Sequence, residues 1–440
     1  LVEDLTTAYQ GPGTNMRGRY SIHFHRGGND ISLPPARIRG CTVVDNPGWA
    51  YVNHSSNVDF IENVSYNVVG GAFQTEAGDE VGSFINNIAI RTVNPNFPLL
   101  GGAEEVLDIR ENAQDFSFQG DGFWIHGGSP KLEGNVVSGA SGHAYIYWTE
   151  GLIEWNKGMR QMPNANIPNG HLLNDQEPVD VWWVPVGSFK NNVGYSAVKG
   201  LSLYYLHASF MENERSEVQV TPAFRQELES TFEELTLWGI QLSAVDLNYA
   251  EHVTFKNSRL VGSGLPGSIG IDANHFHLMN RYRFENIDIE GFEVGIDVPT
   301  QGYTTIEGGR YANKIDFRIR NPQMGPRNLF LNNTSFAEST ITQRQAKIKM
   351  DPNFTLKAEI QNGLLNTDLT KATLFFLMPD RIILNFDGWA RGLYFDQQTP
   401  DFVPMSATNA KVFESPEGGE WDKEVPEEYV GKTNQELYEQ

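Results

Sequence analysis

The sequence predicts an all-β protein built as a parallel β-helix, with long loops and a small C-terminal β appendage. The first observation is a period in the low twenties: Gly48 and Gly70 are 22 residues apart, and Asn63 and Asn87 are 24 apart. The second is that short β-type runs with frequent Gly and Asn fill these intervals, which is typical of a solenoid. Because one coil cannot bury its inner face alone, the coils must stack.

Asparagine recurs at the ends of the short runs. In a stack of coils, equivalent residues form columns with a spacing of about 4.8 Å. We therefore expect inward asparagine ladders that satisfy the backbone of the turns. The asparagines concerned end the runs VVDN, FIEN, FINN, KLEGN, SFKNN and YRFEN, and are Asn46, Asn63, Asn87, Asn135, Asn192 and Asn286.

Changes in residue pattern and composition along the 440 residues predict four regions. Residues 1–16 are expected to be a lead-in from a missing N-terminal part, and residues 17–340 the parallel β-helix. Residues 341–413 change to alternating strands, which predicts a β-rich C-terminal cap or appendage, and residues 414–440 form an acidic tail. Loops are expected at 91–116 and 157–180. The stretch 221–235, with Thr221 followed by Pro222, predicts a helix.

Histidines and a glutamate occupy equivalent places in successive coils. In the strand IHFH, His23 and His25 are two residues apart and so point the same way. Alignment of Ala50-Tyr51 with Ala72-Phe73 sets His54 opposite Glu76. Imidazole and carboxylate are suitable ligands for a first-row transition metal. The spacing thus predicts a divalent metal site at this patch, whereas the alternative is that the histidines are structural, either exposed or hydrogen-bonded.

Further candidates surround this patch. The candidate catalytic acids are Glu76, Asp79 and Asp121, which are among the carboxylates nearest the histidines in the predicted stack. His126, in the strand GDGFWIHGG, is a fifth candidate metal ligand. Arginines beside the histidine strand can contact a carboxylate, and aromatic rings can offer stacking surfaces, so the predicted substrate-binding residues are Arg19, Arg26, Trp124, Tyr145 and Tyr147. A binding role is open for His171, Asp175 and Glu177 in the second loop, whereas His275 and His277 are expected to be structural.

Composition narrows the function classes. The chain has 33 Lys and Arg against 55 Asp and Glu, a net charge of −22, which argues against nucleic-acid and anionic-membrane partners. The same charge opposes a polyanionic glycan at neutral pH unless a local basic groove or bound cation screens it. No run approaches the ~18 apolar residues of a membrane span. The single cysteine, Cys41, excludes an intrachain disulfide.

Three ordered segments carry a family resemblance. The strings GRYSIHFHRGGND, WAYVNHSSNVDFIENVSYNVVGGAFQTEAGDE and GFWIHGGSPKLEGNVVSGASGHAYIYW resemble the β-helix of the cell-migration-inducing hyaluronidase, its transmembrane relative and fibrocystin-L. The likeness runs from about Gly18 to Ser209. It implies a right-handed parallel β-helix in an extracellular protein, with hyaluronan binding or depolymerisation in the animal members.

The residues and the resemblance together predict a secreted or cell-surface carbohydrate-active protein. The first hypothesis is a polysaccharide hydrolase or lyase of the hyaluronidase-like type, assisted by a transition metal at the histidine cluster or by calcium. The alternatives are a non-catalytic module for glycan binding or adhesion, and a metal-binding β-helix protein. The expected partner is a polysaccharide or cell-surface glycan.

Overall fold

The computed structural model describes most of the strands and the turns between them. The continuous described ranges are 20–94, 119–149, 161–167, 184–204, 229–248, 252–273, 282–299, 302–319 and 327–350, with shorter stretches between and after them. Contacts divide the chain into two compact units, Leu1–His252 and Val253–Gln440. Each unit is described by itself below.

Unit 1 consists of three parallel sheets, here named A, B and C, that run along the stacked coils. Sheet A contains β1 (Ile22–Gly28), the first part of β4 (Tyr51–Ile61), β6 (Phe73–Thr75), β9 (Phe123–Ile125), β12 (His143–Trp148), β19 (Lys199–Tyr204) and β22 (Ser243–Asn248). Sheet B contains β2 (Ala36–Arg39), the second part of β4, β7 (Val81–Ile85), β10 (Lys131–Glu133), β17 (Ser188–Lys190) and β20 (Ser230–Glu233).

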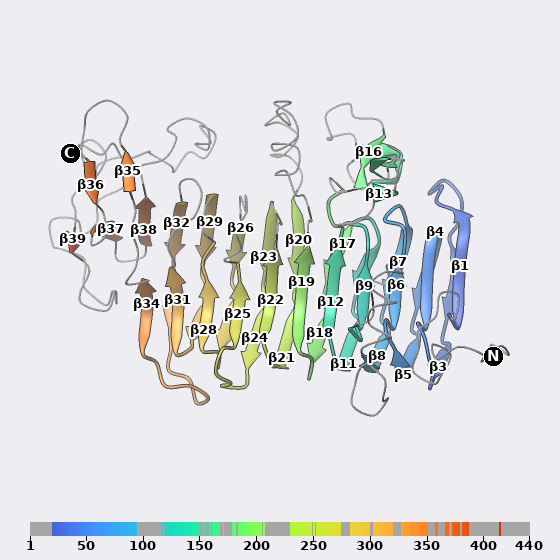
Figure 1. The fold of residues 1–440 in the computed structure, drawn as a ribbon, viewed down its shortest axis with the longest axis horizontal. Helices are drawn as coiled ribbons and strands as arrows, with labels where there is room; N and C mark the ends of the chain where they lie inside the picture. The colour runs from blue at the N-terminus through green and yellow to red at the C-terminus, as the bar shows by residue number, and fades with distance from the viewer. Residues whose placement is uncertain are drawn as a thin grey trace. The chain divides into compact units, whose positions relative to one another are not determined.

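Sheet C completes each coil of unit 1. It contains β3 (Thr42–Val44), β5 (Val64–Val69), β8 (Ile88–Val93), β11 (Val136–Ala140), β18 (Val193–Tyr195) and β21 (Thr236–Ile240). Successive coils contribute neighbouring strands to every sheet, and Figure 1 shows β1, β4, β6, β9 and β12 side by side. The parallel β-helix predicted from the sequence is confirmed.

Aromatic rings stack in the interior of unit 1. Tyr51, Phe73, Phe123 and Tyr145 occupy one register position of sheet A, and each ring lies on the next at 4.7, 4.7 and 5.2 Å between centroids. All four side chains are fully buried. Such offset stacks combine apolar burial with a favourable ring geometry. The stacked rings lie behind the outward-facing residues of sheet A and follow the spacing between successive coils.

An asparagine ladder supports the corners between sheets B and C. Asn63, Asn87, Asn135 and Asn192 are all fully buried. The side-chain oxygen of Asn87 accepts hydrogen bonds from the backbone N–H and the side-chain amide of Asn63. Asn135 accepts the same two bonds from Asn87, and Asn192 accepts them from Asn135, all at 2.9–3.1 Å. Each side chain also donates to a strand carbonyl. The ladder predicted from the sequence is confirmed for these four residues.

Two predicted ladder members lie elsewhere. Asn46 donates to the carbonyls of Gly48 and Trp49 and so closes a local turn. Asn286 is exposed at a corner with φ of 54°, and the ladder position after it is the buried Ile287. In YRFEN the asparagine is thus itself the left-handed corner residue, whereas each ladder asparagine is the residue after the left-handed corner, which is Glu62, Asn86, Gly134 or Asn191.

The helix predicted over 221–235 is wrong where the structure describes it. Residues 230–233 form strand β20, and the Phe232 ring lies 5.0 Å from that of Phe189 in the core. The Glu- and Leu-rich sequence has high helix propensity, but stacking on the neighbouring coil decides the structure.

The described parts of the predicted loops contain short elements. Arg91 to Val93 belong to β8. In the second loop, β13 (Ile153–Glu154) pairs with β14 (Gly158–Met159), and β15 (Gln161–Met162) pairs with β16 (Val179–Asp180), both antiparallel. A 3-10 turn covers Asn164–Asn166. Residues 95–116, the loop residues His171, Asp175 and Glu177, and the pair His275 and His277 lie outside the described residues.

Unit 2 repeats the three-sheet coil. Its first sheet contains β25 (Ile269–Asp272), β28 (Val294–Asp297), β31 (Ile315–Ile319) and β34 (Ala346–Met350). The second contains β23 (Val253–Lys256), β26 (Tyr282–Glu285), β29 (Gly302–Glu307) and β32 (Arg327–Asn332). The third contains β24 (Arg259–Gly262), β27 (Asp288–Glu290), β30 (Arg310–Ala312) and β33 (Ser335–Phe336). Parallel pairing continues to Met350, past the boundary predicted at residue 340.

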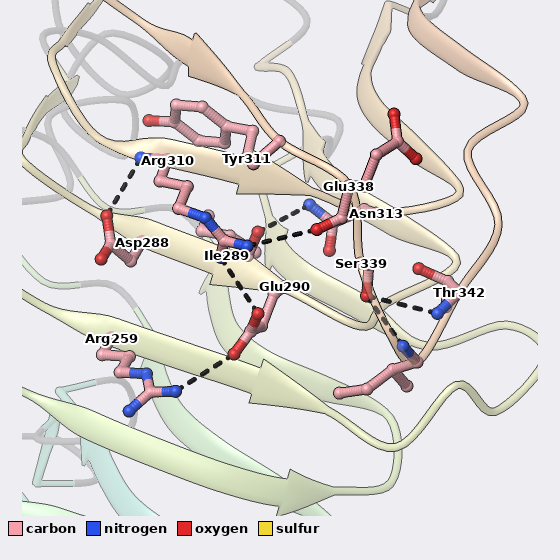
Figure 2. A network of polar contacts seen from close by, with 12 residues as sticks. Arg259, Asp288, Ile289, Glu290, Arg310, Tyr311, Asn313, Glu338, Ser339 and Thr342 are labelled. Carbon is pink, nitrogen blue, oxygen red and sulfur yellow. Dashed lines mark hydrogen bonds and ion pairs between the residues drawn. The ribbon is translucent and has the colours of Figure 1, made fainter.

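Ion pairs connect successive coils on the third sheet of unit 2. Figure 2 shows Glu290 between Arg259 and Arg310, at 3.1 and 3.0 Å. Hydrogen bonding from Arg310 is the main cause that lowers the pKa of Glu290. Because the arginine side chains are 63 % and 40 % exposed, we assign this network a modest role in stability.

Antiparallel strands follow the coils of unit 2. Strand β37 (Ala372–Met378) pairs with β38 (Arg381–Phe386) and with β39 (Phe413–Glu414), while β38 pairs with β32. A further pair is β35 (Lys357–Glu359) with β36 (Asn366–Asp368). This change from parallel to antiparallel pairing agrees with the alternating strands predicted for the C-terminal appendage.

Within the described ranges, no helix has the length and apolar character of a membrane span.

Candidate functional site

The register of sheet A places the predicted site residues in one column. His25 pairs with His54, and the Glu76 N–H donates to the Asn53 carbonyl in the next step of the same ladder. Counting along the paired strands extends the series through β9, β12, β19 and β22. We call this series the outer column: His25, His54, Glu76, His126, Trp148, Tyr204 and Asn248. The neighbouring register position, which holds Asn53 and Thr75, is buried in the core.

Three imidazoles and one carboxylate meet at the first coils of the outer column. One ring nitrogen from each of His23, His25 and His54 lies within 4.8 Å of the others. The His54 Nδ1 donates to Glu76 Oε2 at 2.8 Å, and the His23 Nε2 lies 3.3 Å from the same oxygen. The hydroxyl of Tyr20 donates to the other carboxylate oxygen at 2.8 Å. Glu76 thus fixes two imidazoles and one phenol.

Backbone conformation directs the histidines outward. Each of His25 and His54 ends the extended part of its strand, because the next residue is left-handed: Arg26 has φ of 54° and Ser55 has φ of 48°. Non-glycine residues adopt this conformation uncommonly. The turn after Glu76 is held by the carboxylate of Glu80, which accepts the N–H groups of Ala77 at 2.6 Å and Gly78 at 2.7 Å.

The electrostatics of Glu76 favour its ionised form. Burial alone would raise its pKa, but hydrogen bonds from His23, His54 and Tyr20 together lower the pKa to about 2. The carboxylate is therefore charged at neutral pH. The pKa of His25 is lowered, first by desolvation and then by the neighbouring His54 and His23, which favours the neutral imidazole that a metal requires.

A second carboxylate behaves differently. Glu80 is fully buried, and burial followed by the neighbouring Asp79 raises its pKa to about 7 despite the backbone donors. Asp79 is half-buried and accepts a hydrogen bond from the Ser55 hydroxyl at 2.8 Å. The Glu80 side chain thus supports the turn after Glu76, whereas the Asp79 side chain contacts Ser55, the corner residue after His54.

The residues present fit a transition metal. His23 and His54 each face Glu76 through one ring nitrogen and keep the other for a ligand bond. Metal-bound histidines typically donate their second N–H to a carboxylate. Tetrahedral zinc with bonds of about 2.0–2.1 Å needs nitrogens ~3.3 Å apart, so the imidazoles must close by rotation. His25 is exposed and free to make that movement.

The structure brings together four of the five predicted metal ligands and separates the fifth. His23, His25, His54 and Glu76 form the cluster, with the exposed Arg26 next to His25. His126 belongs to the outer column but is buried, and its Nδ1 donates to the Glu76 carbonyl at 2.8 Å. Its ring lies against Trp124 at 4.8 Å. Arg19 lies outside the described residues.

Asp121 lies away from the cluster, contrary to its predicted proximity. It is five residues before His126 along the chain, which corresponds to ~16 Å of extended strand. Its carboxylate accepts the backbone N–H and the Nδ1–H of His143, both at 2.8 Å. Both side chains are buried. The pair forms a contact between neighbouring coils, and a catalytic role of Asp121 stays a prediction.

The predicted aromatic platform is also corrected. Tyr145 and Tyr147 point into the core and are fully buried, and the Tyr145 hydroxyl donates to the carbonyls of Asn135 and Val193. Trp124 is on the outward side of sheet A but only 1 % exposed. These three rings offer no free face to a sugar, whereas Trp148 on the outer column is half-buried and stacks on Tyr204.

Sequence reasoning missed Tyr20 and the support given by Glu80. Tyr20 precedes the alternating histidines, so the two-residue period did not include it. Its ring stacks on Trp49 of the next coil at 4.8 Å, and this contact aims the hydroxyl at Glu76. The predicted catalytic and ligand roles of the cluster stay predictions.

A parallel β-helix with an outward histidine–carboxylate cluster is the class of protein that the fold and site define. Residues 9–201 match the family model described as CEMIP beta-helix, a range that contains the whole cluster. The resemblance drawn from the sequence is confirmed for this region. No solved structure gives a significant match.

Similar stretches occur in proteins of Dictyostelium discoideum. Two G8 domain-containing proteins are 27 % identical over 202 residues and 26 % identical over 205 residues, and communication mutant protein F is 25 % identical over 201 residues. Each alignment covers 43 % of this chain. The matched stretch is only 13 %, 12 % and 16 % of the respective relatives' lengths.

Proposed function

We propose that this chain belongs to a secreted, carbohydrate-active protein that degrades a polysaccharide with a metal-assisted site of the hyaluronidase-like type. The observation that carries the proposal is the convergence of His23, His25, His54 and Glu76 on the outward face of sheet A. The resemblance of this region to the cell-migration-inducing hyaluronidase supplies the substrate class. A parallel β-helix offers a long surface along which a polymer can bind.

The residues have distinct expected roles. A divalent transition metal at the three imidazoles would act as a Lewis acid and would activate water. Glu76 orients His23 and His54 and keeps their outer nitrogens available. Because its pKa is about 2, Glu76 stays ionised at neutral pH and cannot serve as a general acid there. The Tyr20 hydroxyl, bound to Glu76, is a candidate proton donor at the cluster.

Charge limits the choice of polysaccharide. The net charge of −22 repels a polyanion at neutral pH. Arg26 and a bound cation are the local positive charges at the cluster. We therefore expect a neutral or weakly charged glycan to be cleaved more readily than a highly sulfated one, and cleavage of hyaluronan to need the metal or an acidic medium.

The test separates metal binding from turnover. Elemental analysis of the purified chain, with His25→Ala and Glu76→Gln beside it, measures bound metal, and Arg37→Ala on sheet B is the control. A panel of neutral and acidic polysaccharides is then incubated with and without a chelator, at several pH values, and chain length is measured. We expect near-stoichiometric metal in the wild type and the control. Glu76→Gln should retain less metal, because loss of an orienting carboxylate typically weakens metal affinity 10- to 100-fold.

Three outcomes decide among the functions. Metal-dependent shortening of one polysaccharide supports the enzyme. Binding of a glycan with no shortening at any pH overturns it and selects the non-catalytic binding module. Tight metal binding with no glycan recognition selects a metal-binding β-helix, and a metal-free wild type removes the metal from the proposal.

A further inference from the structure

The outward residues of sheet C form two columns that cross its six strands, which Figure 1 shows side by side as β3, β5, β8, β11, β18 and β21. In three successive residues of each strand the middle side chain is buried and its two neighbours face outward. The register joins these neighbours from coil to coil. We call them the sheet C face: Thr42, Val64, Ile88, Val136, Val193 and Thr236 in the first column, and Val44, Tyr66, Ile90, Ser138, Tyr195 and Trp238 in the second.

The sheet C face is apolar and open. Four large side chains on it are 36–51 % exposed, namely Val44, Tyr66, Ile88 and Trp238. The remaining members are threonine, serine and further apolar residues, each half-buried or exposed. Single apolar residues on a surface are ordinary, but a contiguous apolar patch marks a site of interaction.

No residue of the sheet C face carries a charge, although 20 % of the chain is charged and the net charge is −22. Sheet B of the same coils shows the contrast, because its outward side chains include the ion pairs Arg37–Asp59 and Lys190–Glu233. The third sheet of unit 2 likewise carries ion pairs, as Figure 2 shows around Glu290. An occupant of the sheet C face must therefore be uncharged and apolar where it makes contact.

A second copy of this chain meets that requirement. Two copies that each carry −22 charges repel one another, and they can approach most closely where neither presents a charge. Sheets pack face to face about 10 Å apart with their strands nearly aligned. A twofold axis parallel to the strands reverses the order of the coils in one copy. Trp238 on the last strand then faces the smaller Val44 on the first, and Tyr66 faces Tyr195.

The size of the sheet C face determines how strong this contact can be. Six strands about 4.8 Å apart span ~24 Å, and the two outward positions on one strand are ~7 Å apart. With the side chains included, the face covers on the order of 400 Å² per copy, about half of the ~800 Å² per partner in a stable interface. Contacts of this size are weak and reversible.

We propose that the sheet C face binds the same face of a second copy and forms a weak symmetric dimer. This inference goes beyond the proposed function and does not depend on it. Because the histidine cluster lies on the outward face of sheet A, the dimer leaves the cluster of each copy accessible. Two clusters on one particle can hold one polymer at two points, which raises its apparent affinity without a new contact in either copy.

The experiment measures the dimer fraction of the full chain by sedimentation velocity, from micromolar to millimolar concentration, at low and at high sodium chloride. Tyr66→Glu places a charge on the sheet C face. Trp238→Thr removes apolar area without adding a charge and keeps a residue that favours strands. The control is Arg37→Ala on sheet B, which changes the net charge by the same one unit as Tyr66→Glu at a side chain that is 68 % exposed.

We expect the wild-type dimer fraction to rise with concentration and also with salt, because salt screens the repulsion between the copies. Tyr66→Glu should weaken association at least about tenfold, since like charges then meet across the contact. Trp238→Thr should weaken it about three- to tenfold through lost apolar burial. Arg37→Ala should associate like the wild type, and circular dichroism checks that each variant keeps the wild-type fold.

Three results would overturn the inference. One is a wild type that stays monomeric at millimolar concentration, which leaves the sheet C face for a different protein. Another is a dimer that dissociates as salt rises, because such a dimer is held by ion pairs. The third is equal association of the wild type, Tyr66→Glu and Trp238→Thr, which places the contact on another surface. Metal binding and glycan cleavage are measured separately, so none of these results bears on the proposed function.

Discussion

Replacing Glu76 with glutamine tests whether its carboxylate organises the site. In the native structure the pKa of Glu76 is about 2, against an ordinary value of 4.5, and its side chain is 17 % exposed. A difference of ~2.5 units corresponds to ~3 kcal/mol of stability. Because the native pKa is lower than the unfolded one, this stability is present above pH 4.5 and is lost as pH falls towards 2. By pH 3, about 2 of the ~3 kcal/mol is gone.

The assay is urea unfolding of the wild type and Glu76→Gln, without added metal, at pH 7 and pH 3. The variant should be less stable by up to ~3 kcal/mol at pH 7 and by about 1 kcal/mol at pH 3. Glu233→Gln is the control, since Glu233 forms a surface pair with Lys190 at 3.4 Å and should change stability by under ~1 kcal/mol. A Glu76→Gln deficit that is the same at both pH values would refute the argument that the three hydrogen bonds stabilise the charged carboxylate.

Other predictions concern the scaffold of the same coils. Asn135→Ala removes two accepted and two donated hydrogen bonds from the buried ladder, so unfolding free energy should fall by roughly 3–6 kcal/mol, against under ~1 kcal/mol for the control Asn57→Ala. Equal urea midpoints for the two variants would contradict the ladder. Gly82→Ala puts a Cβ 2.1 Å from the Val58 carbonyl oxygen at a φ of +103°, and should lower soluble yield and thermal midpoint strongly, on the order of 3 kcal/mol or more. Glu80→Ala leaves the backbone N–H groups of Ala77 and Gly78, and that of Ser55 in the preceding coil, without their acceptor, so it should reduce metal binding at these coils even though Glu80 touches no metal, and unchanged binding would remove its supporting role.

Period and alternation predicted the fold and the first half of the site because both depend on local counting. The alignment of Ala50-Tyr51 with Ala72-Phe73 gives the register that the structure shows, and it places His54 beside Glu76. The ladder followed for the same reason, because asparagine recurs at the ends of successive runs.

Counting residues does not say which face of a strand is the interior, and it does not give the register of a strand that follows a long insertion. Alternation divides Tyr145 and Trp148 between two faces, but it does not state which face is the interior; the stack on Phe123 decides that Tyr145 points inward. Asp121 follows a long insertion between coils, so its register could not be counted from Glu76. The sequence of β20 favours a helix, and only Phe189 of the neighbouring coil reveals it as a strand.

The aromatic stack has a consequence for how such a protein changes. Phe73 and Phe123 are 50 positions apart, yet their rings lie 4.7 Å from each other, whereas Tyr51 and Phe73 reach the same spacing with 22 positions between them. The strands on either side of the longer connection therefore keep the same step. A longer connection between two coils therefore need not move the histidines and Glu76 of sheet A. Within a strand, by contrast, one added residue would turn His54 to the interior.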